Sequence, residues 1–288
     1  RVTAARAFDG ERLVVNDGVV LAVRSFGPRD GSPVLALHGF PEMGTTWAPL
    51  AQRLEGVRIV APDLRGHGLS DAPCRVSACR LDRLLGDVVA LVDLVGGPLH
   101  VVGHDWGGAL LWLLAERHPE RIRTATILSA PHPLVLRRAV LGDPGQRRRS
   151  AYVLEAQLPV LPERYLARDD AAFLAGLFSG THDDDEIEAY RVAWSRPGVV
   201  RGMLNWYRAV IRHPGPDPLV AAADRRVHLI TGADDPLFGP DVLDGVRHSP
   251  HREAIHTTAA LISSRWDDGS TLLDARPDAP TSTSRHTR

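Results

Sequence analysis

Residues 99–108 read Leu-His-Val-Val-Gly-His-Asp-Trp-Gly-Gly and lead directly into an apolar stretch, residues 109–115. The apolar residues before Gly103 predict a strand, and those after Gly107 predict a helix that stops before Pro119. A sharp strand-to-helix turn strains its central residue, and flanking glycines relieve the crowding around it. This turn should therefore push the Asp105 side chain into a cleft at the carboxyl edge of a sheet, where the helix N-terminus favours an anion. The alternative is an aspartate that only caps the helix.

The segments around this turn alternate between strand and helix. Strands are predicted at 12–15, 19–26, 33–38, 57–62, 99–103 and 122–129, and helices at 43–54, 81–95 and 107–118. Asp17-Gly18 predicts a hairpin turn between the first two strands. This alternation predicts an α/β fold with a mostly parallel central sheet and helices on both faces. Residues 131–218 contain helical segments only, and strand character returns at residues 227–231.

Composition excludes several classes of function. The 288 residues are 44% apolar and 24% charged, as in ordinary globular proteins. All 34 basic residues are arginine, so the chain can offer neither a Schiff-base lysine nor the lysine of a phosphate-binding P-loop. A net charge of -1 gives no field that would favour nucleic acid or an anionic membrane, and we expect neither as a partner.

Cysteine content and hydropathy bear on the compartment. Two cysteines, Cys74 and Cys79, are too few for a disulfide framework or a four-cysteine zinc site, which favours a reducing cytoplasm. The longest strongly apolar run, residues 109–115, is much shorter than the ~20 residues that cross a bilayer. The sequence begins at Arg1 without an apolar signal core, and we expect its N-terminus to have been trimmed.

Further motifs accompany the Gly-x-Asp-x-Gly turn, which is the nucleophile-elbow pattern with Asp105 in place of serine. They are His38-Gly-Phe-Pro-Glu42, Ser129-Ala-Pro-His-Pro133, Gln146-Arg-Arg-Arg-Ser-Ala-Tyr152, Gln157-Leu-Pro159 and Gly202-Met-Leu-Asn-Trp-Tyr-Arg208. Together they resemble the α/β-hydrolase fold family over roughly residues 14–239. Within that family, the aspartate, the His-Gly-Phe-Pro-Glu loop and the helical insertion resemble the epoxide hydrolase branch.

The resemblance implies roles for particular residues. Asp105 would attack an epoxide carbon and form an alkyl ester, and the Tyr207 hydroxyl would donate to the leaving oxygen. The backbone N–H groups of Phe40 and Trp106 would form the oxyanion hole. The His38 side chain is expected to be structural. No metal or organic cofactor is implied.

The remaining catalytic positions match the family less well. The acid falls on Asp235, with Asp234 as the reserve. The resemblance implies a first lid tyrosine at the position that Glu155 occupies here. Tyr152 could substitute for it because positions three apart share a helix face. The position of the catalytic histidine is occupied by Ser270, and the closing apolar helix is missing after Pro277.

The serine at the position of the catalytic histidine has two explanations. Either the chain is a homologue with an altered end, in which ester hydrolysis is impaired, or a histidine reaches the site by an unusual path. His256 is then the first candidate, although it falls inside a predicted strand at 254–260.

We therefore expect an α/β-hydrolase core at residues 1–130 and 219–276, an all-helical cap at 131–218, and a disordered tail at 277–288. The expected partner is a small hydrophobic epoxide or a related electrophile, and the oligomeric state is left open. One alternative is a haloalkane dehalogenase, in which the Trp106 indole would bind halide, although Phe40 stands where those enzymes commonly carry asparagine. Another is a non-catalytic small-molecule-binding protein on the same fold.

Overall fold

The architecture comes from a computed structural model that describes residues 4–8, 10–215, 227–231 and 235–238. The described strands form one eight-stranded sheet in the order β1-β2-β3-β5-β4-β6-β7-β8. Their bounds are β1 Ala4–Phe8, β2 Gly10–Val14, β3 Val20–Phe26, β4 Ser32–Leu37, β5 Val57–Pro62, β6 Leu99–His104, β7 Ile122–Leu128 and β8 Val227–Ile230.

The sheet has an antiparallel side and a parallel side. Strands β1, β2, β3 and β5 pair antiparallel, and β5, β4, β6, β7 and β8 pair parallel. The predicted hairpin around Asp17-Gly18 is present as β2 and β3, whereas β1 was not predicted. Because β6 lies between β4 and β7, the turn that follows it opens at the carboxyl edge of the parallel strands.

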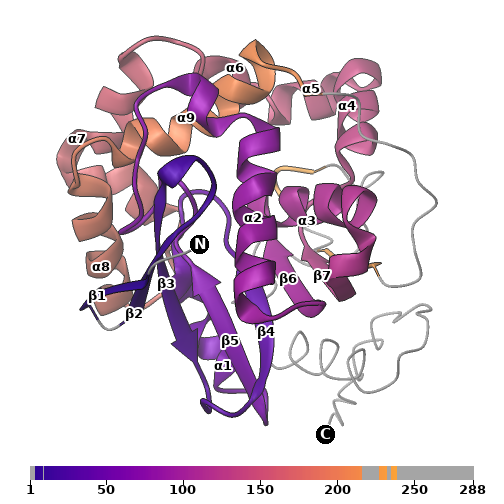
Figure 1. The fold of residues 1–288 in the computed structure, drawn as a ribbon. Helices are drawn as coiled ribbons and strands as arrows, with labels where there is room; N and C mark the ends of the chain where they lie inside the picture. The colour runs from indigo at the N-terminus through magenta and orange to yellow at the C-terminus, as the bar shows by residue number, and fades with distance from the viewer. Residues whose placement is uncertain (1–3, 9, 216–226, 232–234, 239–288) are drawn as a thin grey trace, which may run out of the picture.

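Helices cover the two faces of this sheet (Figure 1). Helices α2 (Leu81–Val95) and α3 (Trp106–Arg117) pack on one face, against Leu35 and Leu37 of β4. Short helix α1 (Ala48–Ala51) packs on the other face, against Val34 and Ala36. The alternation along β4 is the period of two that places successive side chains on opposite faces.

The helix predicted at 43–54 is wrong in extent. The chain there forms a 3-10 turn, η2 (Gly44–Trp47), and then the single turn of α1. The Gly44 N–H donates to Asp63 Oδ1 at 2.8 Å, and a Cβ on Gly44 would lie 2.6 Å from the Ala61 carbonyl oxygen. This close approach fixes the backbone of Gly44 against β5 and the residue that follows it. The remaining 3-10 turns are η1 (Asn16–Gly18), η3 (Val76–Cys79) and η4 (Pro119–Arg121).

The described residues between β7 and β8 form six helices, and the described part of residues 131–218 contains no strand, as predicted. They are α4 Pro133–Gly142, α5 Pro144–Arg149, α6 Tyr152–Glu155, α7 Leu161–Gly176, α8 Asp184–Ser195 and α9 Val199–Arg212. Phe178, Tyr190 and Trp194 stack in the core of this layer, with centroids 4.9 Å apart for the first pair and 5.5 Å for the second.

Two indole groups tie the helical layer to the loops of the sheet. The Trp206 indole on α9 donates to the Arg65 carbonyl at 2.9 Å, and the Trp194 indole on α8 donates to the Pro41 carbonyl at 2.9 Å. Arg65 itself is buried and forms two hydrogen bonds with Asp87, of 2.6 and 2.7 Å. Arg65, in the loop after β5, is therefore structural, and this loop helps to fix the helical layer over the carboxyl edge of the sheet.

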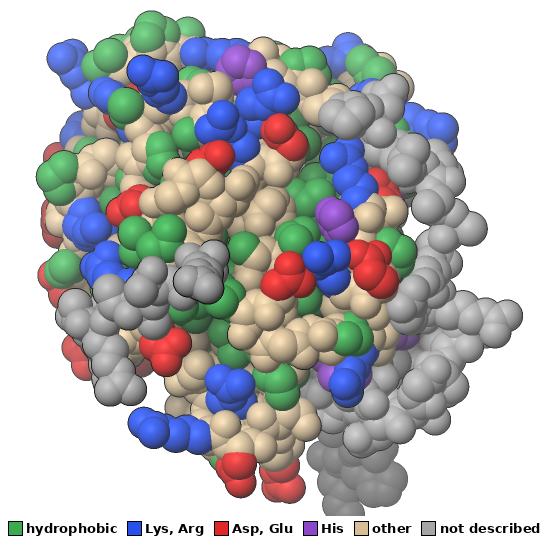
Figure 2. All heavy atoms as spheres, viewed as in Figure 1, with side chains coloured by type: hydrophobic (Ala, Val, Ile, Leu, Met, Phe, Trp, Pro, Cys, Tyr) green, Lys and Arg blue, Asp and Glu red, His purple; other side chains and the backbone are tan. Residues whose placement is uncertain are grey.

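Several sequence predictions lie outside the described residues: Asp234, His256 with its strand at 254–260, Ser270, and the tail at 277–288. Among the helices that are described, none combines the length and apolarity required to cross a membrane. On the face shown in Figure 2, arginine and acidic side chains are interspersed, which agrees with the near-neutral net charge.

Candidate active site

Asp105 sits at the turn between β6 and α3 with φ 48° and ψ -116°. This is a strained conformation for a residue with a side chain. A Cβ on Gly107 would collide with the Leu37 carbonyl, and one on Gly103 would lie 2.7 Å from the Gly107 carbonyl carbon. The Asp105 side chain forms no capping hydrogen bond to α3. The turn is therefore a tight elbow, and the helix-cap alternative is wrong.

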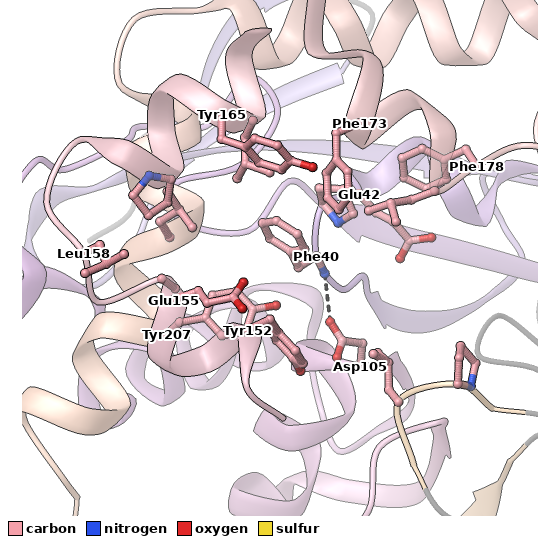
Figure 3. Close-up of a pocket in the computed structure, with 18 of the residues that line it drawn as sticks. Phe40, Glu42, Asp105, Tyr152, Glu155, Leu158, Tyr165, Phe173, Phe178 and Tyr207 are labelled. Atoms are coloured by element: carbon pink, nitrogen blue, oxygen red, sulfur yellow. Dashed lines mark hydrogen bonds between the residues drawn. The ribbon is translucent and has the colours of Figure 1, made fainter. Parts of the chain in front are cut away.

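The Asp105 carboxylate is held by the loop after β4. The Phe40 backbone N–H donates to Asp105 Oδ2 at 2.9 Å, which Figure 3 marks with a dashed line. Gly39 makes this approach possible, since a Cβ there would lie 2.5 Å from the Asp105 Cβ. Trp106 is the first residue of α3, where backbone N–H groups have no partner within the helix. The Phe40 N–H thus binds this carboxylate, and a second N–H, without a partner inside its helix, follows Asp105 directly in the chain.

His38, at the start of that loop, has a structural role, as predicted. Its Nδ1 lies 2.8 Å from the Gly39 carbonyl, and its Nε2 accepts from the Leu64 N–H at 2.9 Å. Complete burial lowers the pKa of His38 to about 4, so the ring is neutral at neutral pH.

Glu42, in the loop after β4, and His104, the residue before Asp105, form a buried pair. Glu42 Oε2 lies 2.9 Å from His104 Nδ1 and accepts from the Gly39 N–H at 3.1 Å, while Oε1 accepts from the Thr46 hydroxyl at 2.8 Å. The sequence motifs contain both residues, but nothing in the spacing showed that they would meet. Because Glu42 accepts from the Gly39 N–H, the pair fixes the backbone of this loop at the residue that precedes Phe40.

Two tyrosines face the elbow. Tyr207 on α9 packs edge-on against the rings of Phe40 and Trp106, with centroids 5.4 and 5.1 Å away. Tyr152 on α6 lies against Tyr207, with ring centroids 5.6 Å apart. Burial and then the charge of Asp105 raise the pKa of both phenols. Both hydroxyls are consequently protonated at neutral pH and can act as donors.

Asp235 is buried at the start of the described segment 235–238. Its Oδ1 accepts from the Leu237 N–H at 2.8 Å, and its charge contributes to the raised pKa of Tyr152. The Gln146 side chain donates to the Leu237 carbonyl at 2.8 Å and attaches this segment to α5. Asp235 is thus near Tyr152 and the elbow, and the local turn typical of aspartate is also present.

These groups border a cavity of about 710 Å³ between the sheet edge and the helical layer (Figure 3). From the end of β6 and the loop after β4, its lining includes Asp105, His104 and Glu42. The walls from α6 and α7 and the turn after α7 are mainly apolar or aromatic, and they include Leu158, Leu161, Tyr165, Phe173, Leu177 and Phe178. Polar groups beside an apolar wall suit a hydrophobic ligand with one reactive polar end.

Comparison with known proteins agrees with this geometry. Residues 32–171 match the family model described as alpha/beta hydrolase fold. An AB hydrolase superfamily protein, YfhM, of Bacillus subtilis is 36% identical over 69% of this chain and 72% of its own. Epoxide hydrolase 4 of Mus musculus is 34% identical over 64% of this chain, which spans 55% of that relative's length. An epoxide hydrolase from Bacillus megaterium, solved with an inhibitor, superposes with a TM-score of 0.78 at 26% identity, covering 89% of this chain and 100% of the other.

The chain belongs to the α/β-hydrolase fold family, in its epoxide hydrolase branch. Within this α/β-hydrolase, the residues selected from sequence come together around one cavity. Asp105, Phe40, Tyr152 and Tyr207 line it directly. The second tyrosine in the cavity is Tyr152, whose ring contacts that of Tyr207, while position 155 carries a glutamate.

Proposed function

We propose that this protein opens epoxides through an alkyl ester formed on Asp105. The observation that carries the proposal is the arrangement of donors around the elbow. One carboxylate oxygen of Asp105 is held by the Phe40 N–H, and the neutral phenols of Tyr152 and Tyr207 border the same cavity. A nucleophile on one side and acids on the other are what ring opening of a strained ether requires.

The bonds to Asp105 assign its two oxygens. Oδ1 attacks an epoxide carbon, and that carbon–oxygen bond of the ring breaks as the ester bond forms. The alkoxide that is released takes a proton from a tyrosine hydroxyl. Tyr207 lines the same cavity as Asp105 and its raised pKa keeps the phenol protonated, so it can supply this proton. Oδ2 becomes the carbonyl oxygen of the ester and keeps the Phe40 N–H.

Hydrolysis of the ester completes the cycle. Water attacks the carbonyl carbon, and the N–H groups of Phe40 and Trp106 stabilise the charge that develops on Oδ2. Asp235 would orient a histidine that activates this water. Ser270 occupies the family's histidine position and cannot accept a proton at neutral pH as imidazole does. We propose that ester formation is retained and that its hydrolysis is slow.

The helical layer has the place of a cap in this proposal. Residues 131–218 would form the cap over a core built from residues 1–130 and 219–276. Tyr152 and Tyr207 come from this layer and Asp105 from the core. A ligand between the two layers would therefore meet the nucleophile from below and the acids from above. The substrate would be a small hydrophobic epoxide.

The dehalogenase alternative is less well supported. It would use the Trp106 indole N–H to hold a halide ion, but Trp106 is not among the described residues that line the cavity. Phe40 also stands where such enzymes commonly carry asparagine. The described contacts favour the epoxide reaction.

Covalent mapping tests the proposal. The protein is incubated with styrene oxide, quenched in acid and digested, and the peptide that gains the mass of the epoxide is sequenced. The modification should lie on Asp105 and disappear in Asp105→Asn, which keeps the shape of the side chain. A modification elsewhere with Asp105 unmodified would overturn the assignment. Saturable binding of the epoxide with no adduct and no diol would instead identify a non-catalytic binding protein.

A further inference from the structure

Glu155 places an uncompensated charge in the apolar part of the cavity. Its side chain is exposed, lines the cavity, and forms no ion pair or side-chain hydrogen bond with any described residue. Arg208 reaches the backbone around it, donating to the carbonyls of Ala156 and Leu158 at 2.9 Å. The Arg208 guanidinium is already bonded to Glu163, at 2.7 and 3.0 Å, and so does not neutralise Glu155.

Glu155 lies beyond the reacting groups, towards the part of the cavity that would hold the rest of a substrate. Tyr152 and Glu155 are three residues apart on α6, so they share a face and are separated by roughly 4.5 Å along its axis. The charge of Asp105 contributes to the raised pKa of Tyr152, which places Tyr152 near the nucleophile. Figure 3 shows Glu155 beside Tyr152 and Tyr207, with Tyr165 and Phe173 across the cavity.

None of the described residues that line the cavity is an arginine that could neutralise this carboxylate. The described residues that line the cavity include Glu42, Asp105 and Glu155 but no arginine, and the chain has no lysine. His104 is bonded to Glu42. The aromatic wall opposite adds ring faces, which attract cations and not anions.

We propose that Glu155 selects substrates by charge. The cavity would favour epoxides whose end distant from the ring carries a cation, such as an ammonium group, over those that carry a carboxylate there. The inference rests on the proposed function, because it takes this cavity as the substrate site. The mechanism is Coulombic: a cation near Glu155 is attracted and a carboxylate is repelled, and the exposed position allows salt to screen both effects.

Aryl glycidyl ethers with different para groups test this proposal. The para group is trimethylammonium, carboxylate or a methyl ester, and the rate constant for ester formation at low substrate concentration is measured for each. The wild-type protein should prefer the cation to the anion. In Glu155→Gln this preference should fall about tenfold at low ionic strength, the size expected for a unit charge about 6 Å away in a largely aqueous setting. The rate for the neutral ester should change less than twofold.

Controls separate charge selection from a general effect. Glu188→Gln removes the same charge from an exposed position on α8 that does not line the cavity, and it should leave the preference unchanged. Raising the salt concentration to 1 M should reduce the wild-type preference towards that of Glu155→Gln. An unchanged preference in Glu155→Gln, or an equal change in Glu188→Gln, would overturn the proposal.

Binding measurements keep this inference distinct from the proposed reaction. Dissociation constants for 4-phenylbutylammonium and 4-phenylbutyrate are measured by calorimetry in wild type and Glu155→Gln. If no epoxide reacts but the ratio of the two constants shifts about tenfold in the variant, the reaction is wrong and the charge selection stands. If epoxides react and neither the binding ratio nor the rate preference shifts, the reaction stands and the charge selection is wrong.

Discussion

Replacing Tyr207 by phenylalanine should slow ester formation while leaving the fold intact. Tyr207 is 6% exposed, and its ring packs edge-on against Phe40, Trp106 and Tyr152. Phenylalanine keeps those ring contacts and opens no cavity, so the change removes only the hydroxyl.

The kinetic effect follows from the loss of one donor. Removing a donor that stabilises developing negative charge costs on the order of 10²–10³ in rate. Tyr152 lies against Tyr207 and can still donate, so the single variant should fall near the lower end of that range. Tyr152→Phe should show a similar loss. If both hydroxyls reach the same oxygen, the double variant should lose more than either single one, with non-additive free energies.

Single-turnover stopped-flow fluorescence gives the required measurement, because Trp106 adjoins Asp105 and reports on ester formation. Enzyme in excess is mixed with styrene oxide, and the rate constant is compared among the wild type, the two single variants and the double variant. Thermal unfolding of each variant shows whether it is folded. An alkylation rate within twofold of wild type in a folded Tyr207→Phe would refute the role assigned to this hydroxyl.

Three other changes test the supports of the site. Trp194→Phe removes the indole hydrogen bond to the Pro41 carbonyl but keeps the ring stack. Ester formation should slow several-fold while the affinity for a neutral ligand stays unchanged. An equal loss in the rate and in the affinity would indicate a general disturbance of the site instead. Gly107→Ala drives a methyl group into the Leu37 carbonyl and should lower the free energy of unfolding by at least about 1–3 kcal/mol, measured by urea denaturation. Burial lowers the pKa of His67 from 6.5 to about 3, so below pH 6.5 the folded state binds fewer protons than the unfolded state. The contribution of His67 to the free energy of unfolding is therefore complete above pH 6.5. It should fall by about 3 kcal/mol by pH 4. Urea unfolding between pH 7 and pH 4 checks this, and His67→Asn should flatten the dependence; an equally steep dependence in that variant would show that other groups cause it.

Elements with a strong local pattern were predicted closely. The range predicted for α2 agrees with the observed Leu81–Val95, and that for β5 with Val57–Pro62. Residues 43–54 were predicted less well, because the contact of Gly44 with β5 decides their conformation. Strand β1 was missed because its existence depends on pairing with β2, which no spacing in residues 4–8 indicates.

The sequence by itself determined the elbow at Asp105 and the loop that contributes Phe40. A tight turn restricts its own neighbours to glycine, and a backbone N–H is positioned by the residues next to it, so both leave a local pattern. Tertiary structure alone decided that Glu42 would meet His104, 62 residues away, and that Glu155 would border a cavity whose described lining contains no arginine. Periodicity fixes which face of its own element a side chain occupies, but the packing of separate elements decides what lies opposite that face.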